Sequence, residues 1–92
     1  MIRLLIADDE KLEREALAEL VQRRFEREVV LEMAENGRKA ADTAVLWGAD
    51  LILMDIEMKF MDGMMAAEEI RKKDTEVIIL SLIHISEPTR RS

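Results

Sequence analysis

The 92-residue sequence contains no cysteine, no tyrosine, one tryptophan and one proline. Without cysteine, disulfide bonds, thiolate metal ligands and thiol nucleophiles are excluded. Aromatic residues make up only 3% of the chain, so aliphatic side chains must form almost the whole core. Long hydrophobic runs are missing as well: runs such as residues 51–54 (LILM) fall far short of the ~20 residues that a membrane-spanning helix needs. Since the N-terminus also shows no signal-peptide pattern, we expect a cytoplasmic protein that does not contact membranes.

The sequence has no excess of positive charge. Fourteen Lys and Arg residues stand against 20 Asp and Glu, which gives a net charge of −6. This balance argues against direct binding of nucleic acid or of an anionic membrane surface by this segment. The length allows a single small domain, and the hydrophobic content of 49% is typical of a globular one.

Four short apolar runs alternate with longer amphipathic segments. The runs predict buried strands at residues 2–7, 29–34, 51–54 and 77–80, and the segments predict helices at residues 11–25, 38–47 and 64–73. Such an alternation is typical of an α/β fold with right-handed crossovers and a parallel sheet. In the first helix, apolar residues recur at three- and four-residue spacing and predict one buried stripe, formed by Leu12, Ala16, Leu17, Leu20, Val21 and Phe25. Before the third helix, Gly63 is expected to allow a positive φ.

Carboxylates follow two of the predicted strands. Asp8 and Asp9 come directly after the first strand, and Asp55 ends the third. In an open parallel sheet, ligands bind beyond the carboxyl ends of the strands. If the first and third strands are neighbours, the three carboxylates converge and repel one another unless a cation neutralises them. Mg²⁺ is the natural partner of such an oxygen cluster, and a carboxylate beside it can attack a phosphoryl group.

These motifs resemble those of the response-regulator receiver domains of two-component signalling. The resemblance covers roughly residues 2–81 and rests on Ala7-Asp8-Asp9-Glu10, Asp55, Met58, Asp62-Gly63 and Ser81, in the family's order and spacing. The stretches LLIADDEKLEREAL and AENGRKA are most similar to receivers of AraC-type transcriptional regulators. The resemblance implies a flavodoxin-like (CheY-like) fold with strand order 2-1-3-4, in which the fifth strand and the last helices of the family are missing.

The resemblance also implies roles for individual residues. Asp55 is the expected phosphoacceptor, and Ser81 the hydroxyl that contacts the phosphoryl group and reports the modified state. Mg²⁺ is expected to bind Asp9 directly, Asp8 chiefly through water, Asp55, and the backbone carbonyl of Glu57. The implied partner is a sensor histidine kinase. The implied parent is a transcriptional regulator that binds DNA through a C-terminal domain outside this segment and can dimerise.

The sequence departs from the family pattern in two places. Lys59 stands where the family usually has a proline that stiffens the loop. No lysine follows Lys73, so the family's phosphoryl-pairing lysine at the end of the fifth strand is absent. Residues 82–92 do not continue the strand–helix alternation, and we expect a truncated receiver domain at 1–81 followed by a non-native or disordered tail at 82–92.

Two other functions compete with a phosphorylatable switch that has no enzymatic activity of its own. One is a Mg²⁺-dependent phosphohydrolase of another α/β family, with Glu57 as its second acid, although the sequence offers no general acid or base partner. The other is an inactive fragment that folds marginally or aggregates through the exposed edge of its fourth strand. Nucleotide binding is disfavoured, because the sequence has neither a glycine-rich dinucleotide turn nor a G-K-[ST] loop.

Overall fold

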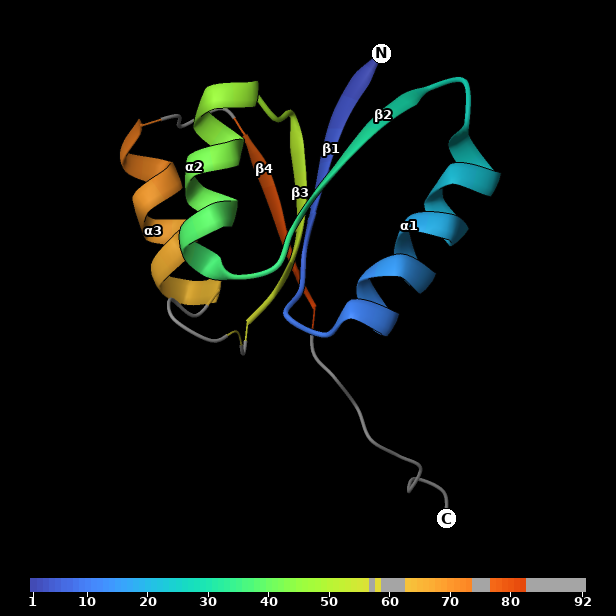
Figure 1. The fold of residues 1–92 in the computed structure, drawn as a ribbon. Coiled ribbons are helices and arrows are strands. Elements are labelled where there is room, and N and C mark those ends of the chain that lie inside the picture. Colours follow the sequence, from blue (N-terminus) through green and yellow to red (C-terminus); the bar gives the residue numbers. More distant parts are fainter. Residues whose placement is uncertain (57, 59–62, 74–76, 83–92) are drawn as a thin grey trace.

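The computed structural model describes residues 1–56, 58, 63–73 and 77–82, with residues 81 and 82 described through their backbone. Strands and helices alternate along the chain as predicted (Figure 1). The elements are β1 Ile2–Ala7, α1 Lys11–Phe25, β2 Val29–Ala34, α2 Gly37–Trp47, β3 Leu51–Asp55, α3 Gly63–Lys73 and β4 Ile78–Leu82. The predicted bounds of the first three elements hold to the residue, and the later ones shift by one or two residues. Strand β4 therefore includes Leu82, one residue beyond the predicted end of the domain.

The four strands form one parallel sheet in the order β2-β1-β3-β4, which confirms the predicted fold class and strand order. The register aligns the carboxyl ends of the strands. Ala7 of β1 lies opposite Ala34 of β2 and Met54 of β3, and Met54 in turn lies opposite Ser81 of β4. Residues that follow β1 and β3 therefore leave the sheet at the same edge, the lower one in Figure 1.

Helices α2 and α3 cover one face of the sheet (Figure 1). The main core lies beneath them, where fully buried strand residues such as Leu5, Ile52 and Met54 pack against both helices. The helices present mostly small side chains to this core, namely Ala40, Ala41, Ala44 and Ala66. Small side chains on the inner face allow a helix to approach a sheet closely, and Trp47 is the only aromatic residue packed against this core among the described residues.

The other face is covered by α1 alone among the described helices (Figure 1). Of the apolar stripe predicted to be buried there, only Val21 is buried, whereas the exposed fractions of Leu12 and Leu20 are 80% and 58%. The prediction of a fully buried stripe is therefore wrong for the described part of the chain. Helix α1 packs mainly on β1 and β2, so only the part of its stripe that lies over these strands is removed from water. On the same face of the sheet, Ile78 and Leu80 of β4 are exposed as well. Among the described helices, none has both the length and the apolar character that crossing a membrane requires.

Helix α2 has well-formed caps at both ends. The Asn36 side chain accepts a hydrogen bond from the Lys39 N–H at 2.8 Å, which satisfies one of the free donors of the first turn. At the other end, Gly48 adopts a left-handed φ of 79° and donates its N–H to the Ala44 carbonyl. The Asn36 cap follows β2, and the Gly48 cap precedes β3. The two caps therefore fix how α2 is joined to these strands.

Replacing Asn36 by Ala is expected to destabilise the fold by about 1 kcal/mol, because the capping oxygen is lost. Urea unfolding followed by circular dichroism measures the change as a lower midpoint with an unchanged slope. Asn36→Asp is the matched control, since its carboxylate keeps the acceptor and leaves the midpoint nearly unchanged. Equal losses in the two variants would show that the cap is not the cause.

Candidate metal centre

Three aspartates converge where β1 and β3 end. Asp8 and Asp9 follow β1 directly, and Asp55 is the last residue of β3, the neighbouring strand. One carboxylate oxygen from each of Asp8, Asp9 and Asp55 lies within 4.8 Å of the other two. The structure thus brings together the three acids that the predicted strand order placed at one edge.

Two of these carboxylates are almost fully buried. The exposed fraction is 2% for Asp8 and 3% for Asp55, while Asp9 is half-buried. Burial removes water, which would otherwise stabilise the negative charges, and the short separations add mutual repulsion. An all-carboxylate donor set of this size suits a hard divalent cation such as Mg²⁺, which binds few protein carboxylates and keeps several waters. Asp9 is thus the member of the cluster that keeps partial contact with solvent.

A tight turn presents Asp8 and Asp9 to this cluster. The Glu10 N–H donates to Oδ1 of Asp8 at 2.9 Å, a local bond that favours a turn directly after the strand. The Asp8 N–H continues the sheet by donating to the Ala34 carbonyl, and the Asp8 carbonyl accepts from Nη1 of Arg14 at 2.8 Å. The backbone of Asp8 is therefore bonded on both sides. Nothing in the spacing of Arg14 along the sequence indicates this contact.

Gly63 lies against the backbone of Asp55. Its N–H donates to the Ile56 carbonyl at 2.7 Å, and a Cβ at this position would lie 2.4 Å from the Asp55 carbonyl oxygen. The expectation that Gly63 needs a positive φ is wrong, because it is the first residue of α3, and Gly48 is the glycine with positive φ among the described residues. The side chain is excluded here by close approach of α3 to the end of β3.

The remaining predicted site residues are only partly visible in the described structure. The backbone of Ser81 lies opposite Met54, the residue immediately before Asp55. Strand β4 therefore brings Ser81 to the same edge of the sheet as Asp55. The side chain of Ser81 lies outside the described part of the chain, as do Glu57 and Lys59. Their predicted roles stay predictions.

An ion-pair group at the surface links α2 and α3. Arg38 bonds Asp42 of its own helix and Glu69 of α3, and Lys73 also pairs with Glu69. The hydrogen bond from Arg38 lowers the pKa of the Glu69 carboxyl below its usual range, and the same bond raises the pKa of Arg38. The Arg38 side chain is exposed and that of Glu69 is half-buried at the surface, so this pairing between α2 and α3 contributes little to overall stability.

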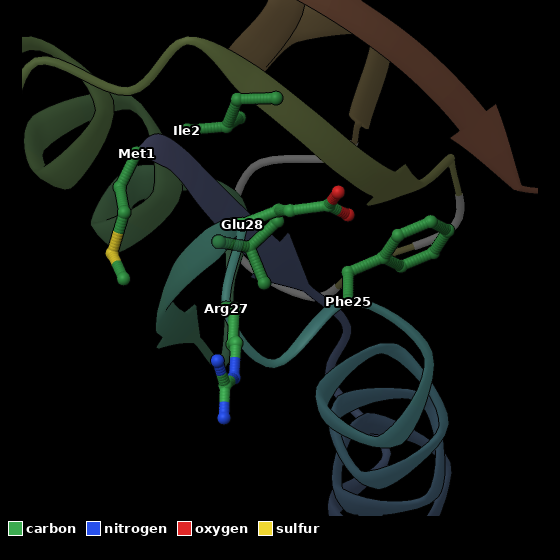
Figure 2. A pocket seen from close by; sticks show the side chains of 6 residues that line it. Met1, Ile2, Phe25, Arg27 and Glu28 are labelled. Carbon is green, nitrogen blue, oxygen red and sulfur yellow. The ribbon is translucent and has the colours of Figure 1, made fainter.

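A hollow at the opposite end of the sheet is the other candidate for a binding site (Figure 2). It is lined by Met1, Ile2, Phe25, Arg27, Glu28 and Val29. Figure 2 shows the charged ends of Arg27 and Glu28 pointing in different directions, so no polar groups converge there on one ligand atom. Within the described residues, the aspartate cluster is thus the arrangement with defined chemistry.

Comparisons with known proteins agree with the fold. A family model described as "Response regulator receiver domain" matches residues 4–92. A crystal structure of the response regulator TrrA from Thermotoga maritima in complex with Mg²⁺-BeF has a TM-score of 0.83 and 38% identity, covering 94% of this chain and 72% of that one.

Two curated relatives belong to much longer proteins. Protein-glutamate methylesterase/protein-glutamine glutaminase 2 of Carboxydothermus hydrogenoformans is 41% identical over 81 residues, which is 87% of this chain and 23% of that protein. The transcriptional regulatory protein LnrK of Bacillus subtilis is 37% identical over 82 residues, which is 89% of this chain and 37% of that protein. The chain therefore spans about a quarter to about two fifths of the length of these relatives.

Proposed function

The chain belongs to the response regulator receiver family, and from this membership we propose that it accepts a phosphoryl group on Asp55 from a sensor histidine kinase, in a Mg²⁺-dependent step of two-component signalling. The observation that carries the proposal is the convergence of Asp55 with Asp8 and Asp9 at the carboxyl ends of β1 and β3. A buried nucleophilic carboxylate beside two further acids is a poor arrangement for a purely structural role, because the three charges repel.

The proposed transfer needs no additional reactant. A carboxylate oxygen of Asp55 attacks the phosphorus of the kinase phosphohistidine, an O–P bond forms, and the P–N bond breaks. The electron pair of that bond returns to the imidazole, which takes up a proton. The product is an acyl phosphate on Asp55 and an unmodified histidine on the kinase.

Asp9 and Asp8 are proposed to hold Mg²⁺, which when bound neutralises charge on the phosphoryl oxygens. Asp9 is the better direct ligand, because it is only half-buried, whereas Oδ1 of the buried Asp8 already accepts the Glu10 N–H. The Glu57 carbonyl is proposed as a further ligand. The similarity to TrrA supports the choice of metal, since that response regulator was crystallised with Mg²⁺-BeF.

Ser81 is proposed to contact the phosphoryl oxygens and to couple them to β4. The register supports this role, because Ser81 pairs with Met54, the residue immediately before Asp55, on the neighbouring strand. A hydroxyl at this position can donate a hydrogen bond to the added phosphate, and the strand that carries it then responds to the modification.

For the whole protein we propose a transcriptional regulator whose DNA-binding domain follows the receiver. The similarity to LnrK supports this choice. The relative named as a methylesterase and glutaminase carries the name of an enzyme, so the output of the whole protein is a separate question from the receiver chemistry.

Intact-mass measurement after incubation with a small phosphodonor tests the proposed receiver function. In the presence of Mg²⁺ the chain is expected to gain one phosphoryl group, and chelation by EDTA is expected to remove nearly all of this gain. Circular dichroism of the same samples serves as the control for folding. A folded chain that gains no phosphoryl group, or one that is labelled equally well with EDTA, would contradict the proposal.

A further inference from the structure

Arg14 connects the first turn of α1 to the loop that carries the acids. Its guanidinium Nη1 donates to the backbone carbonyl of Asp8 at 2.8 Å, and its own N–H donates to the Glu10 carbonyl at 2.9 Å. Arg14 is half-buried, in contrast to most charged residues of α1. The N–H bond is the ordinary first-turn bond of the helix, so the contact specific to the Arg14 side chain is the one to the Asp8 carbonyl, where the turn from Asp8 to Glu10 begins.

We propose that Arg14 is a positioning residue that holds the β1–α1 turn in the conformation in which Asp8 and Asp9 meet Asp55. This inference rests on the proposed function, because its consequence is the affinity of the acid cluster for Mg²⁺. The Asp8 N–H is fixed to β2 through Ala34, and its carbonyl is fixed to α1 through Arg14. The peptide groups before and after Asp8 are thus each held by a hydrogen bond, which restrains the turn from rotating to relieve the repulsion among the carboxylates.

The acceptor that Arg14 contacts defines how it acts. A backbone carbonyl is a neutral acceptor, so the bond at 2.8 Å fixes the turn while the carboxylate charges are kept for a cation. The charge of Arg14 has the opposite effect, because a guanidinium near the cluster repels Mg²⁺. Loss of the charge alone would strengthen Mg²⁺ binding, whereas loss of the positioning contact would weaken it. The two roles therefore predict changes of opposite sign.

Isothermal titration of the chain with MgCl₂ separates these roles. Arg14→Met keeps the apolar part of the side chain and removes both the charge and the N–H donors of the guanidinium. Arg14→Lys keeps the charge and replaces the planar guanidinium by an ammonium group. Arg14→Met is expected to weaken Mg²⁺ binding about tenfold or more, the usual effect of losing a group that orients metal ligands. Arg14→Lys is expected to weaken it by a smaller factor.

Arg23→Met is the matched control. Arg23 lies on the same helix, its side chain is 76% exposed, and its ion pair is with Glu19 of α1. The variant makes the same change of charge far along the helix from the turn, and its Mg²⁺ affinity is expected to stay close to that of the original chain. Melting with and without Mg²⁺ provides a second readout: the stabilisation by Mg²⁺ shrinks in Arg14→Met and is retained in Arg23→Met.

Several results would overturn the inference. If Arg14→Met binds Mg²⁺ as tightly as the original chain, or more tightly, Arg14 does not position the acids. If Arg23→Met weakens binding equally, the weakening is not specific to the contact between Arg14 and the turn, and the positioning role is overturned. If circular dichroism shows that Arg14→Met does not fold, the test uses Arg14→Lys instead. An unchanged affinity of Arg14→Lys for Mg²⁺ then overturns the positioning role. A folded original chain that binds no Mg²⁺ overturns the proposed function and this inference together, whereas normal binding with insensitive Arg14 variants overturns this inference alone.

Discussion

Replacing Asp55 by Asn is expected to abolish phosphoryl labelling and at the same time to stabilise the metal-free chain. The labelling is lost because an amide nitrogen or oxygen does not replace a carboxylate as nucleophile. The stability rises because one of three negative charges within 4.8 Å of one another is removed while the volume of the side chain is kept. Coulomb's law at such separations gives about 1 to 4 kcal/mol per pair, for effective dielectric constants between those of water and of a protein surface.

Two measurements on this variant check the two effects. Intact mass after incubation with a small phosphodonor and Mg²⁺ reports the labelling, and urea unfolding in EDTA reports the stability. Asp42→Asn is the matched control, since it makes the same chemical change on an exposed carboxylate of α2. It is expected to leave labelling intact and not to stabilise the chain. Labelling that persists in Asp55→Asn would place the phosphoacceptor elsewhere and refute the assignment.

The gain in stability has a further consequence for Mg²⁺. In the original chain, Mg²⁺ is expected to raise the melting temperature by relieving the repulsion among the three acids and by mass action. In Asp55→Asn there is less repulsion to relieve and Mg²⁺ binds more weakly, so Mg²⁺ is expected to raise the melting temperature by a smaller amount. A variant that lost labelling and yet kept the full stabilisation by Mg²⁺ would indicate that Asp55 is separate from the metal-binding group.

The acid cluster was predictable from the sequence because it depends only on strand order and strand ends. Short apolar runs indicated where β1 and β3 end, and the family resemblance implied that these two strands are neighbours. Their parallel pairing brings Asp8 and Asp55 to the same edge. No knowledge of side-chain packing was needed. The same applies to the bounds of β1, α1 and β2, which follow from the change of hydrophobic period along the chain.

Burial on the α1 face was not predictable in the same way. The apolar spacing of α1 indicates which residues can face a core, but their burial depends on what else covers that face of the sheet. In the described structure Leu12 and Leu20 remain exposed, while Val21, which lies over Leu4 and Val29, is buried. A periodic pattern defines a face of a helix, and the neighbouring elements determine how much of it is removed from water.

The roles of Arg14 and Gly63 were also hidden in the sequence, for a related reason. Arg14 acts through a backbone carbonyl six residues earlier in the chain, and any residue type supplies such a carbonyl. Gly63 acts through the absence of a side chain where α3 meets the end of β3. Both contacts depend on distances between elements, which residue types and spacing do not contain.

Replacing Gly63 by Ala is expected to lower both the stability and the phosphoryl labelling. The new Cβ would lie 2.4 Å from the Asp55 carbonyl oxygen and 2.7 Å from the Ile56 Cα. Both neighbours are backbone atoms, so the clash cannot be relieved by a side-chain rotation, and α3 or the end of β3 must move. Overpacking of this kind typically costs about 1 to 3 kcal/mol. Because the displaced segment carries Asp55, the carboxylate cluster is expected to lose its geometry as well.

Gly48→Ala is the matched control for this variant. Gly48 has a φ of 79°, and a Cβ there would meet only the Arg3 guanidinium at 3.4 Å, at the end of α2. The left-handed backbone makes this Ala destabilising by about 1 to 2 kcal/mol, a loss similar to that expected for Gly63→Ala. The two variants therefore differ mainly in where the strain arises. At a temperature where circular dichroism shows both to be folded, Gly48→Ala is expected to be labelled like the original chain and Gly63→Ala much less. Equal labelling would mean that the close approach of α3 supports only the fold, and that the position of Asp55 is fixed by the sheet alone.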